Sequence, residues 1–183
     1  MSDQVKPAAN VAALRAKVQN LAEKDQVRAQ RLIVAIAGVV VAQMLPPGVV
    51  KGGSAMKARL GDENSRFTPD LDAARRGSVD DFVDQFEKKL RSGWNGFTGR
   101  LAERTPPSPV GVPGVYVMKP YDVKLDFNGR PLCTLRVELG HNEIGDAENP
   151  IWVIDHGLLE LFHNVGLPQP GPIPVMRSDQ AGL

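Results

Sequence analysis

Two short segments of this chain carry residue types that could bind a cation and an anion side by side. Residues 66–72 read Arg-Phe-Thr-Pro-Asp-Leu-Asp, and in an extended strand the period of 2 places Thr68, Asp70 and Asp72 on one face. Carboxylate oxygens that converge in this way are the ligands that a hard divalent cation prefers. The sequence therefore predicts a metal site at Asp70 and Asp72.

The second segment, residues 51–57, precedes the first and reads Lys-Gly-Gly-Ser-Ala-Met-Lys. Gly52 and Gly53 allow a backbone turn to approach a phosphate closely, and Ser54 could cap a following helix whose N-terminal amides attract the same anion. Taken singly, Asp-x-Asp is common on protein surfaces and Gly-Gly-Ser is usually only a turn. Their succession predicts a phosphate cradle beside a metal pair.

Together the two segments resemble the active-site region of the DNA polymerase β-like nucleotidyltransferases, and among these the AbiEii-type toxins that include the MenT group. Such proteins read Gly-Gly-[Ser/Thr] before a helix and Arg-x-[Ser/Thr]-x-Asp-[Leu/Val/Ile]-Asp on the next strand, and residues 52–54 and 66–72 match every position. The resemblance covers residues 30–140 and the N-terminal catalytic half of such proteins. It implies an α+β fold of the α/β nucleotidyltransferase type, with a mixed β-sheet flanked by helices and a polymerase β-like core.

The resemblance also implies a reaction, in which Mg²⁺ or Mn²⁺ at Asp70 and Asp72 supports transfer of a nucleotide from an NTP to an RNA acceptor. In MenT-like members this acceptor is the 3′ end of tRNA. A cognate antitoxin is the implied protein partner, and in some systems it is a kinase that phosphorylates the position occupied here by Thr68. The residues implied to bind the nucleotide are Gly52, Gly53, Ser54, Lys57 and Arg66.

Glu138 is the candidate for a third carboxylate. Asn128-Gly129 predicts a tight hairpin between strands at Tyr121–Phe127 and Leu132–Leu139, and alternation in the second strand places Glu138 on the polar face. The resemblance places a third metal-binding and catalytic carboxylate on this strand. Asp126 is a weaker competitor, and a surface ion pair is the alternative role for Glu138.

Other patterns predict the elements that must position these residues. Val11, Leu14, Val18 and Leu21 recur at helical spacing, and the apolar run Leu32–Leu45 is too short for a membrane span, so it predicts a buried helix on the sheet. Ser78 followed by Phe82, Phe86 and Leu90 predicts a capped amphipathic helix. We expect residues 92–113, rich in Gly and Pro, to form a long surface loop or lid, Ile151–Ile154 a strand, Leu158–Phe162 a helical turn and Pro168–Pro174 an extended arm.

Composition predicts a single soluble, cytoplasmic domain without a membrane partner. The 183 residues are 42% apolar and 23% charged, with a net charge of +1, so nucleic-acid binding must come from a local patch. The lone Cys133 excludes an internal disulfide and indicates packing rather than nucleophilic chemistry. Within residues 1–183 we expect an N-terminal helix at 1–30, a core at 31–140 and a C-terminal extension at 141–183.

Two alternatives to an active toxin stay open. The sequence has no match to the Ala-x-Lys-type lysine helix that AbiEii-type toxins carry beyond the strand region, which favours a catalytically inactive or truncated relative that acts as a nucleotide- or antitoxin-binding module. The second alternative is a small-molecule nucleotidyltransferase of the antibiotic-adenylating type. Such enzymes share the Gly-Ser and Asp-x-Asp motifs, but the two motifs are usually closer together than Ser54 and Asp70 are here.

Overall fold

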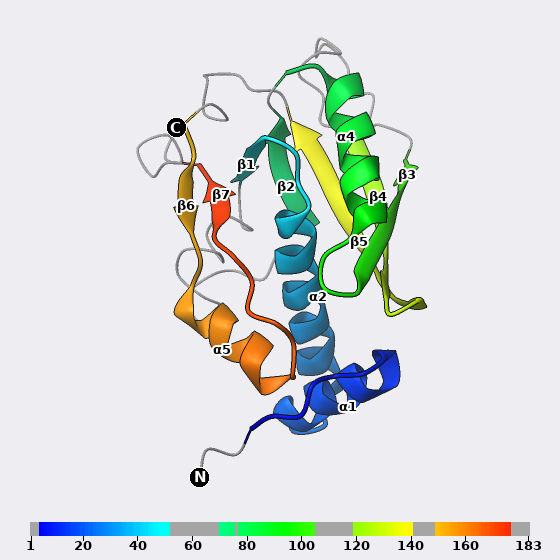
Figure 1. Ribbon diagram of the computed structural model, residues 1–183, viewed down its shortest axis with the longest axis vertical. Helices are drawn as coiled ribbons and strands as arrows, with labels where there is room; N and C mark the ends of the chain where they lie inside the picture. Colours follow the sequence, from blue (N-terminus) through cyan, green and yellow to red (C-terminus); the bar gives the residue numbers. More distant parts are fainter. Residues whose placement is uncertain (1–3, 52–69, 76, 105–118, 141–148, 177–183) are drawn as a thin grey trace.

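Seven strands form one mixed sheet in the computed structural model, which describes residues 4–51, 70–75, 77–104, 119–140 and 149–176 (Figure 1). The strand order is β3-β4-β5-β2-β1-β7-β6. The strands are β1 Gly48–Lys51, β2 Asp70–Arg75, β3 Phe97–Glu103, β4 Lys119–Phe127, β5 Arg130–Gly140, β6 Ile151–Val153 and β7 Ile173–Val175. The helices in the described ranges are α1 Val11–Leu21, α2 Gln26–Gln43, α4 Val79–Ser92 and α5 His156–Asn164.

The centre of the sheet is β2, which pairs parallel with β5 and antiparallel with β1. Parallel strands cannot be joined by a tight turn, and the chain between β2 and β5 contains α4 and the antiparallel strands β3 and β4. At the other edge β7 pairs parallel with β1 and antiparallel with β6. This arrangement confirms the predicted α+β fold with a mixed sheet flanked by helices.

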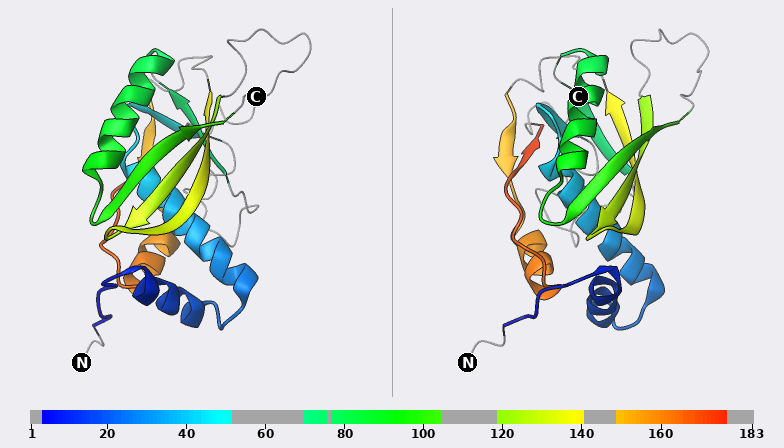
Figure 2. Two further views of the ribbon diagram at one scale, coloured as in Figure 1. Left: turned by 90° about the vertical axis from the view of Figure 1, so that its right-hand side faces the viewer. Right: turned by 45° about the vertical axis from the view of Figure 1, so that its right-hand side comes forward.

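Alternation along the strands gives the sheet one apolar and one polar face. On β5, Leu135, Val137 and Leu139 are buried, whereas Thr134 and Arg136 between them are exposed. The buried set belongs to one continuous hydrophobic core that includes side chains of α2 and α4. We call the opposite, largely polar surface the open face. Figure 2 shows α4 lying against one side of the curved strands β3, β4 and β5.

The predicted buried helix at 32–45 is confirmed as part of α2. Asp25 caps this helix by accepting a hydrogen bond from the Arg28 amide, and its apolar residues from Ile33 onward are almost all buried. The helix contacts β5 and β7, and α1 packs against it near its N-terminal end (Figure 1). None of the described helices is both long enough and apolar enough to cross a membrane.

The predicted amphipathic helix is also confirmed, and it contacts β3. Ser78 accepts a hydrogen bond from the Asp81 amide at the start of α4, and Phe82, Phe86 and Leu90 are buried. The helix lies so close to β3 that a Cβ on Gly99 would be 3.0 Å from the Leu90 Cδ2 atom. A side chain at position 99 would therefore force the Leu90 and Val123 side chains to shift.

The expectation of a loop across residues 92–113 is wrong for Phe97–Glu103, which forms β3. The inward positions of this strand are Phe97, Gly99 and Leu101. Because α4 packs closely against β3, the middle position is a glycine where the alternation would have an apolar side chain. The glycine interrupts the apolar pattern of the strand, so the sequence alone indicates a Gly-rich loop. Residues 105–113 of the same prediction lie outside the described ranges.

The C-terminal region is more regular than expected. Ile151–Ile154 was expected as a strand, and β6 confirms it, while the helical turn expected at Leu158–Phe162 extends over His156–Asn164 as α5. The extended arm expected at Pro168–Pro174 ends in β7, which joins the sheet through pairing with β1. Proline can stand in so short a strand near the sheet edge because few ladder hydrogen bonds are lost.

Candidate active site

Asp70 and Asp72 share the open face of β2, as their spacing predicts. Both side chains are half-buried, whereas Leu71 and Ala73 point into the core on the opposite face. The strand holds this orientation firmly because it is hydrogen-bonded on both sides, to β1 and to β5. The two carboxylates are therefore presented by the central strand of the sheet.

Glu138 lies directly beside Asp72. The parallel register pairs Asp72 with Glu138 and Asp70 with Arg136, so all four side chains project from the same face. The competitor Asp126 also lies on this face, but β4 pairs it with Pro131, at the far end of β5. At about 3.3 Å per residue, Asp126 is on the order of 20 Å from Asp72. The register thus brings Glu138, and not Asp126, to the aspartate pair.

The proximity of these carboxylates changes the protonation of Asp72. Burial, followed by the negative charges of Glu138 and Asp70, raises the pKa of the Asp72 carboxyl from 3.8 to about 6. A side-chain hydrogen bond with Glu138 is a smaller cause of the same rise, because only the protonated form of Asp72 can donate it. The structure therefore holds a cluster of carboxyl groups in which the charged form of Asp72 is disfavoured.

Two cationic side chains that sequence reasoning did not assign to the site lie next to these carboxylates. Lys51 is directly opposite Asp72 on β1, and its charge lowers the Asp72 pKa in part. The Arg136 guanidinium is 4.0 Å from an Asp70 carboxylate oxygen. For Lys51 the available signal was its position immediately before Gly52, and for Arg136 it was the alternation with Glu138 on one strand.

The carboxylates fit a magnesium-type cation that is completed by substrate. Among the described residues, no three His, Cys, Asp or Glu side chains are grouped as the ligands of one metal ion. Mg²⁺, however, is usually held by one or two carboxylates, with waters and substrate phosphates supplying the other oxygens. Asp72 lies within hydrogen-bond contact of Glu138, and Asp70 is close enough to raise the Asp72 pKa as well. A divalent cation bound there would offset the repulsion that acts on Asp72.

The residues expected to bind the nucleotide, namely Gly52, Gly53, Ser54, Lys57 and Arg66, lie outside the described ranges, as does Thr68. What the structure does describe is the chain on either side of them, because β1 ends at Lys51 and β2 begins at Asp70. These two strands are antiparallel neighbours. The segment that carries the expected phosphate-binding residues therefore starts and returns at the carboxylates.

Cys133 is not part of this arrangement. It lies on the same face of β5 as the buried Leu135 and Val137, opposite Glu138. Burial raises the pKa of its thiol to about 11, although Arg15 lowers it in part. At neutral pH the side chain is a neutral thiol, which is a poor nucleophile. This agrees with the packing role inferred from the sequence.

Comparison with solved structures identifies the fold. MenT4, a nucleotidyltransferase toxin from Mycobacterium tuberculosis H37Rv, superposes with a TM-score of 0.59 at 18% identity over 91% of this chain. A proposed nucleotidyltransferase and the protein JHP933, both from Helicobacter pylori, give TM-scores of 0.44 and 0.42 at 15% identity, each over 80% of this chain. No protein-family model and no curated protein matches the sequence.

This chain spans only part of these structures, since it corresponds to 56% of MenT4 and to 52% and 51% of the two H. pylori proteins. The similarity to MenT4 extends over nearly all of the chain, so it includes the sheet that carries Asp70, Asp72 and Glu138. At this level of identity the comparison establishes architecture. We conclude that the chain has the nucleotidyltransferase fold found in the toxin MenT4.

Proposed function

We propose that this chain is a metal-dependent nucleotidyltransferase toxin that transfers nucleotides from an NTP to an RNA acceptor, the 3′ end of tRNA. The observation that carries the proposal is the cluster of Asp70, Asp72 and Glu138 on adjacent strands of a nucleotidyltransferase fold. Nucleotidyl transfer requires carboxylates that hold cations against the attacking and leaving oxygens. Mg²⁺ or Mn²⁺ bound there would neutralise the charge that develops on the phosphate.

The chain's own residues would do the positioning. Asp70 and Asp72 would hold the cation, and Glu138, the neighbour of Asp72 on β5, would be the third metal-binding and catalytic carboxylate. Lys51 would supply positive charge on the β1 side of the carboxylates, near the segment that starts at Gly52. We propose that Gly53, Ser54, Lys57 and Arg66 bind the triphosphate in that segment.

The decisive test is a transfer assay with matched variants. Purified protein is incubated with Mg²⁺, each labelled NTP in turn and total tRNA, and label in RNA is measured. A metal contributes several kcal/mol of transition-state stabilisation, so Asp70→Ala and Asp72→Ala should each lower transfer by a factor of about 10³ or more. Asp126→Ala, on the same face but remote, is the control and should retain activity. Undiminished transfer by Asp72→Ala with an intact fold would exclude the metal assignment.

A second candidate function is a catalytically inactive module that binds nucleotide or antitoxin. Calorimetric titration with a non-hydrolysable NTP and Mg²⁺ distinguishes the two. Binding without any transfer to RNA would support the module, and transfer would support the enzyme.

We also propose that a cognate antitoxin controls the protein through Thr68. A phosphate there would add about −1.5 to −2 of charge within two positions of Asp70, where it would compete for the cation and repel the triphosphate. Co-expression with the neighbouring gene should yield a protein heavier by one phosphate, mapped to Thr68 by peptide mass spectrometry, and Thr68→Glu should be impaired in transfer. A fully active Thr68→Glu protein would contradict this mechanism.

A further inference from the structure

An acidic pocket lies on the helix-covered side of the sheet, on the opposite face from Asp70 and Asp72. It opens between α4 and the strands β3 and β4 and has a volume of about 300 Å³. Its strand residues, among them Leu101 and Tyr121, alternate with Ala102 and Asp122 of the open face. The pocket is therefore separate from the proposed transfer site, and the inference below does not depend on that proposal.

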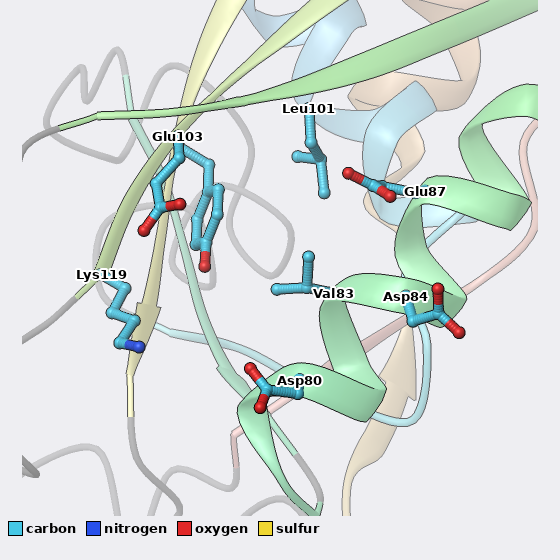
Figure 3. A pocket seen from close by; sticks show the side chains of 8 residues that line it. Asp80, Val83, Asp84, Glu87, Leu101, Glu103 and Lys119 are labelled. Atoms are coloured by element: carbon cyan, nitrogen blue, oxygen red, sulfur yellow. The ribbon is translucent and has the colours of Figure 1, made fainter.

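Among the described residues, four carboxylates and one lysine line this pocket. Asp80, Asp84 and Glu87 project from α4, and Glu103 projects from β3 on the other side, as Figure 3 shows. Asp84 forms an exposed ion pair of 3.2 Å with Lys88, so Asp80, Glu87 and Glu103 carry most of the remaining negative charge opposite Lys119. Like charges that face one another across a pocket favour an occupant of positive charge.

Tyr121 provides the second, independent indication of a ligand. Its side chain lines the pocket although the residue is only 6% exposed, and no described residue hydrogen-bonds its hydroxyl. Burial raises the pKa of this hydroxyl, and the charges of Glu103, Asp80 and Glu87 raise it further, while Arg75 lowers it in part. The hydroxyl is accessible from the pocket, so an occupant of the pocket could supply the hydrogen-bond partner that a tyrosine hydroxyl in this position usually has.

The walls of the pocket indicate an organic cation rather than a metal ion. Val83, Leu101 and the ring of Tyr121 offer apolar surface between the charged groups, which a hydrated metal ion would leave uncovered. An alkyl chain packs well on such surface while its ammonium group reaches the carboxylates, and an aromatic ring face attracts a cation as well.

We propose that this pocket binds an alkylammonium group, supplied either by a free linear polyamine or by a lysine side chain of a partner protein. The ammonium group donates hydrogen bonds to Glu87, Glu103 and the Tyr121 hydroxyl, and the alkyl chain lies against Val83 and Leu101. The charged residues of the open face do not line this pocket, so an NTP or RNA substrate bound there should not compete with the alkylammonium group.

The test is calorimetric titration of the whole chain with spermidine and, separately, with an end-blocked lysine tetrapeptide. Glu103→Gln and Glu87→Gln should each weaken binding about three- to fivefold, and the double variant about tenfold, as expected for partly exposed ion pairs. Tyr121→Phe should weaken binding without changing the charge. Asp81→Asn removes an exposed carboxylate of α4 that does not line the pocket, and it should bind as the wild type does.

The two probes also distinguish the sources of the cation. Tighter binding of spermidine identifies a free polyamine as the ligand, and tighter binding of the peptide identifies a protein lysine. Failure of both probes to bind would overturn the proposal, as would an equal loss of affinity in Asp81→Asn and Glu103→Gln, because that result would indicate non-specific charge attraction. Circular dichroism of each variant confirms that the compared proteins are folded.

Discussion

At the scale of single residues, Asp72 shows the conflict between stability and the proposed function. A carboxylate that must bind a cation is placed beside two others and is partly withdrawn from water, which raises its pKa to about 6. In the absence of a cation this arrangement costs free energy, since the charged form is disfavoured. Perturbed protonation of this kind is typical of functional sites.

This conflict predicts a pH-dependent stability. Because the Asp72 pKa is raised from 3.8 to about 6 in the folded state, its contribution to stability is complete below about pH 3.8 and is lost as the pH rises through about 6. Asp72→Asn imitates the neutral form, so without divalent cations it should unfold at a higher urea concentration than the wild type at pH 7.5. At pH 4 the two midpoints should converge. Equal midpoints at pH 7.5 would show that Asp72 carries no such penalty.

At the scale of elements, the contact between α4 and the sheet stabilises the strands that support Glu138. Phe86 is fully buried and meets Phe82 edge to face, with ring centroids 5.9 Å apart. Beneath the helix, Gly99 allows a close approach to β3, and β3 in turn pairs with β4. The helix therefore helps to hold β4 and, through it, β5 in place.

Truncation of the aromatic side chain should be costly. Phe86→Ala should lower the free energy of unfolding by about 3–5 kcal/mol, because it removes a large apolar group and leaves a cavity. Gln85→Ala, an exposed position on the same helix, should change it by less than about 0.5 kcal/mol. Urea unfolding followed by circular dichroism measures both values. A Phe86→Ala loss below about 1 kcal/mol would show that the α4 contact contributes little.

At the scale of the whole molecule, the described helices α2 and α4 pack on the apolar face of the sheet, opposite the open face. Arg100 on β3 and Lys124 on β4 are direct cross-strand neighbours on this open face, both exposed, and neither forms an ion pair with another described residue. Like charges placed opposite each other destabilise a sheet slightly. Together with Arg136 they place three cations on the open face, where Asp122 and Asp126 also lie.

If RNA lies across the open face, this surface should contact its phosphates. Arg100→Gln and Lys124→Gln should each weaken RNA binding at low salt and reduce the slope of log affinity against log salt by about 1. Arg91→Gln, at the end of α4 in the helical layer, removes the same charge and should have little effect. Fluorescence anisotropy with labelled tRNA at several salt concentrations measures the slopes. Equal slopes in all three variants would place the RNA elsewhere.

The local patterns of the sequence determined much of this protein. The periodicity in α1, α2 and α4 and the Asn128-Gly129 turn could be interpreted directly because each depends on neighbours in the chain. Asn128 and Gly129 both adopt the positive φ that the tight turn requires. The alternation that places Asp70 with Asp72 is local in the same sense.

Only the tertiary structure decided which distant residues meet. Lys51 reaches Asp72, and Glu138 rather than Asp126 reaches it from the other side, through strand pairings whose register depends on contacts across the whole sheet. The strand β3 was not predicted because α4 packs closely against position 99, which is therefore a glycine. Without a side chain there, the alternation of apolar and polar residues is interrupted. The acidic pocket likewise joins a helix face to two strand ends that no sequence spacing connects. Patterns between neighbouring residues can be seen in the sequence, whereas contacts between distant segments depend on how the whole sheet packs.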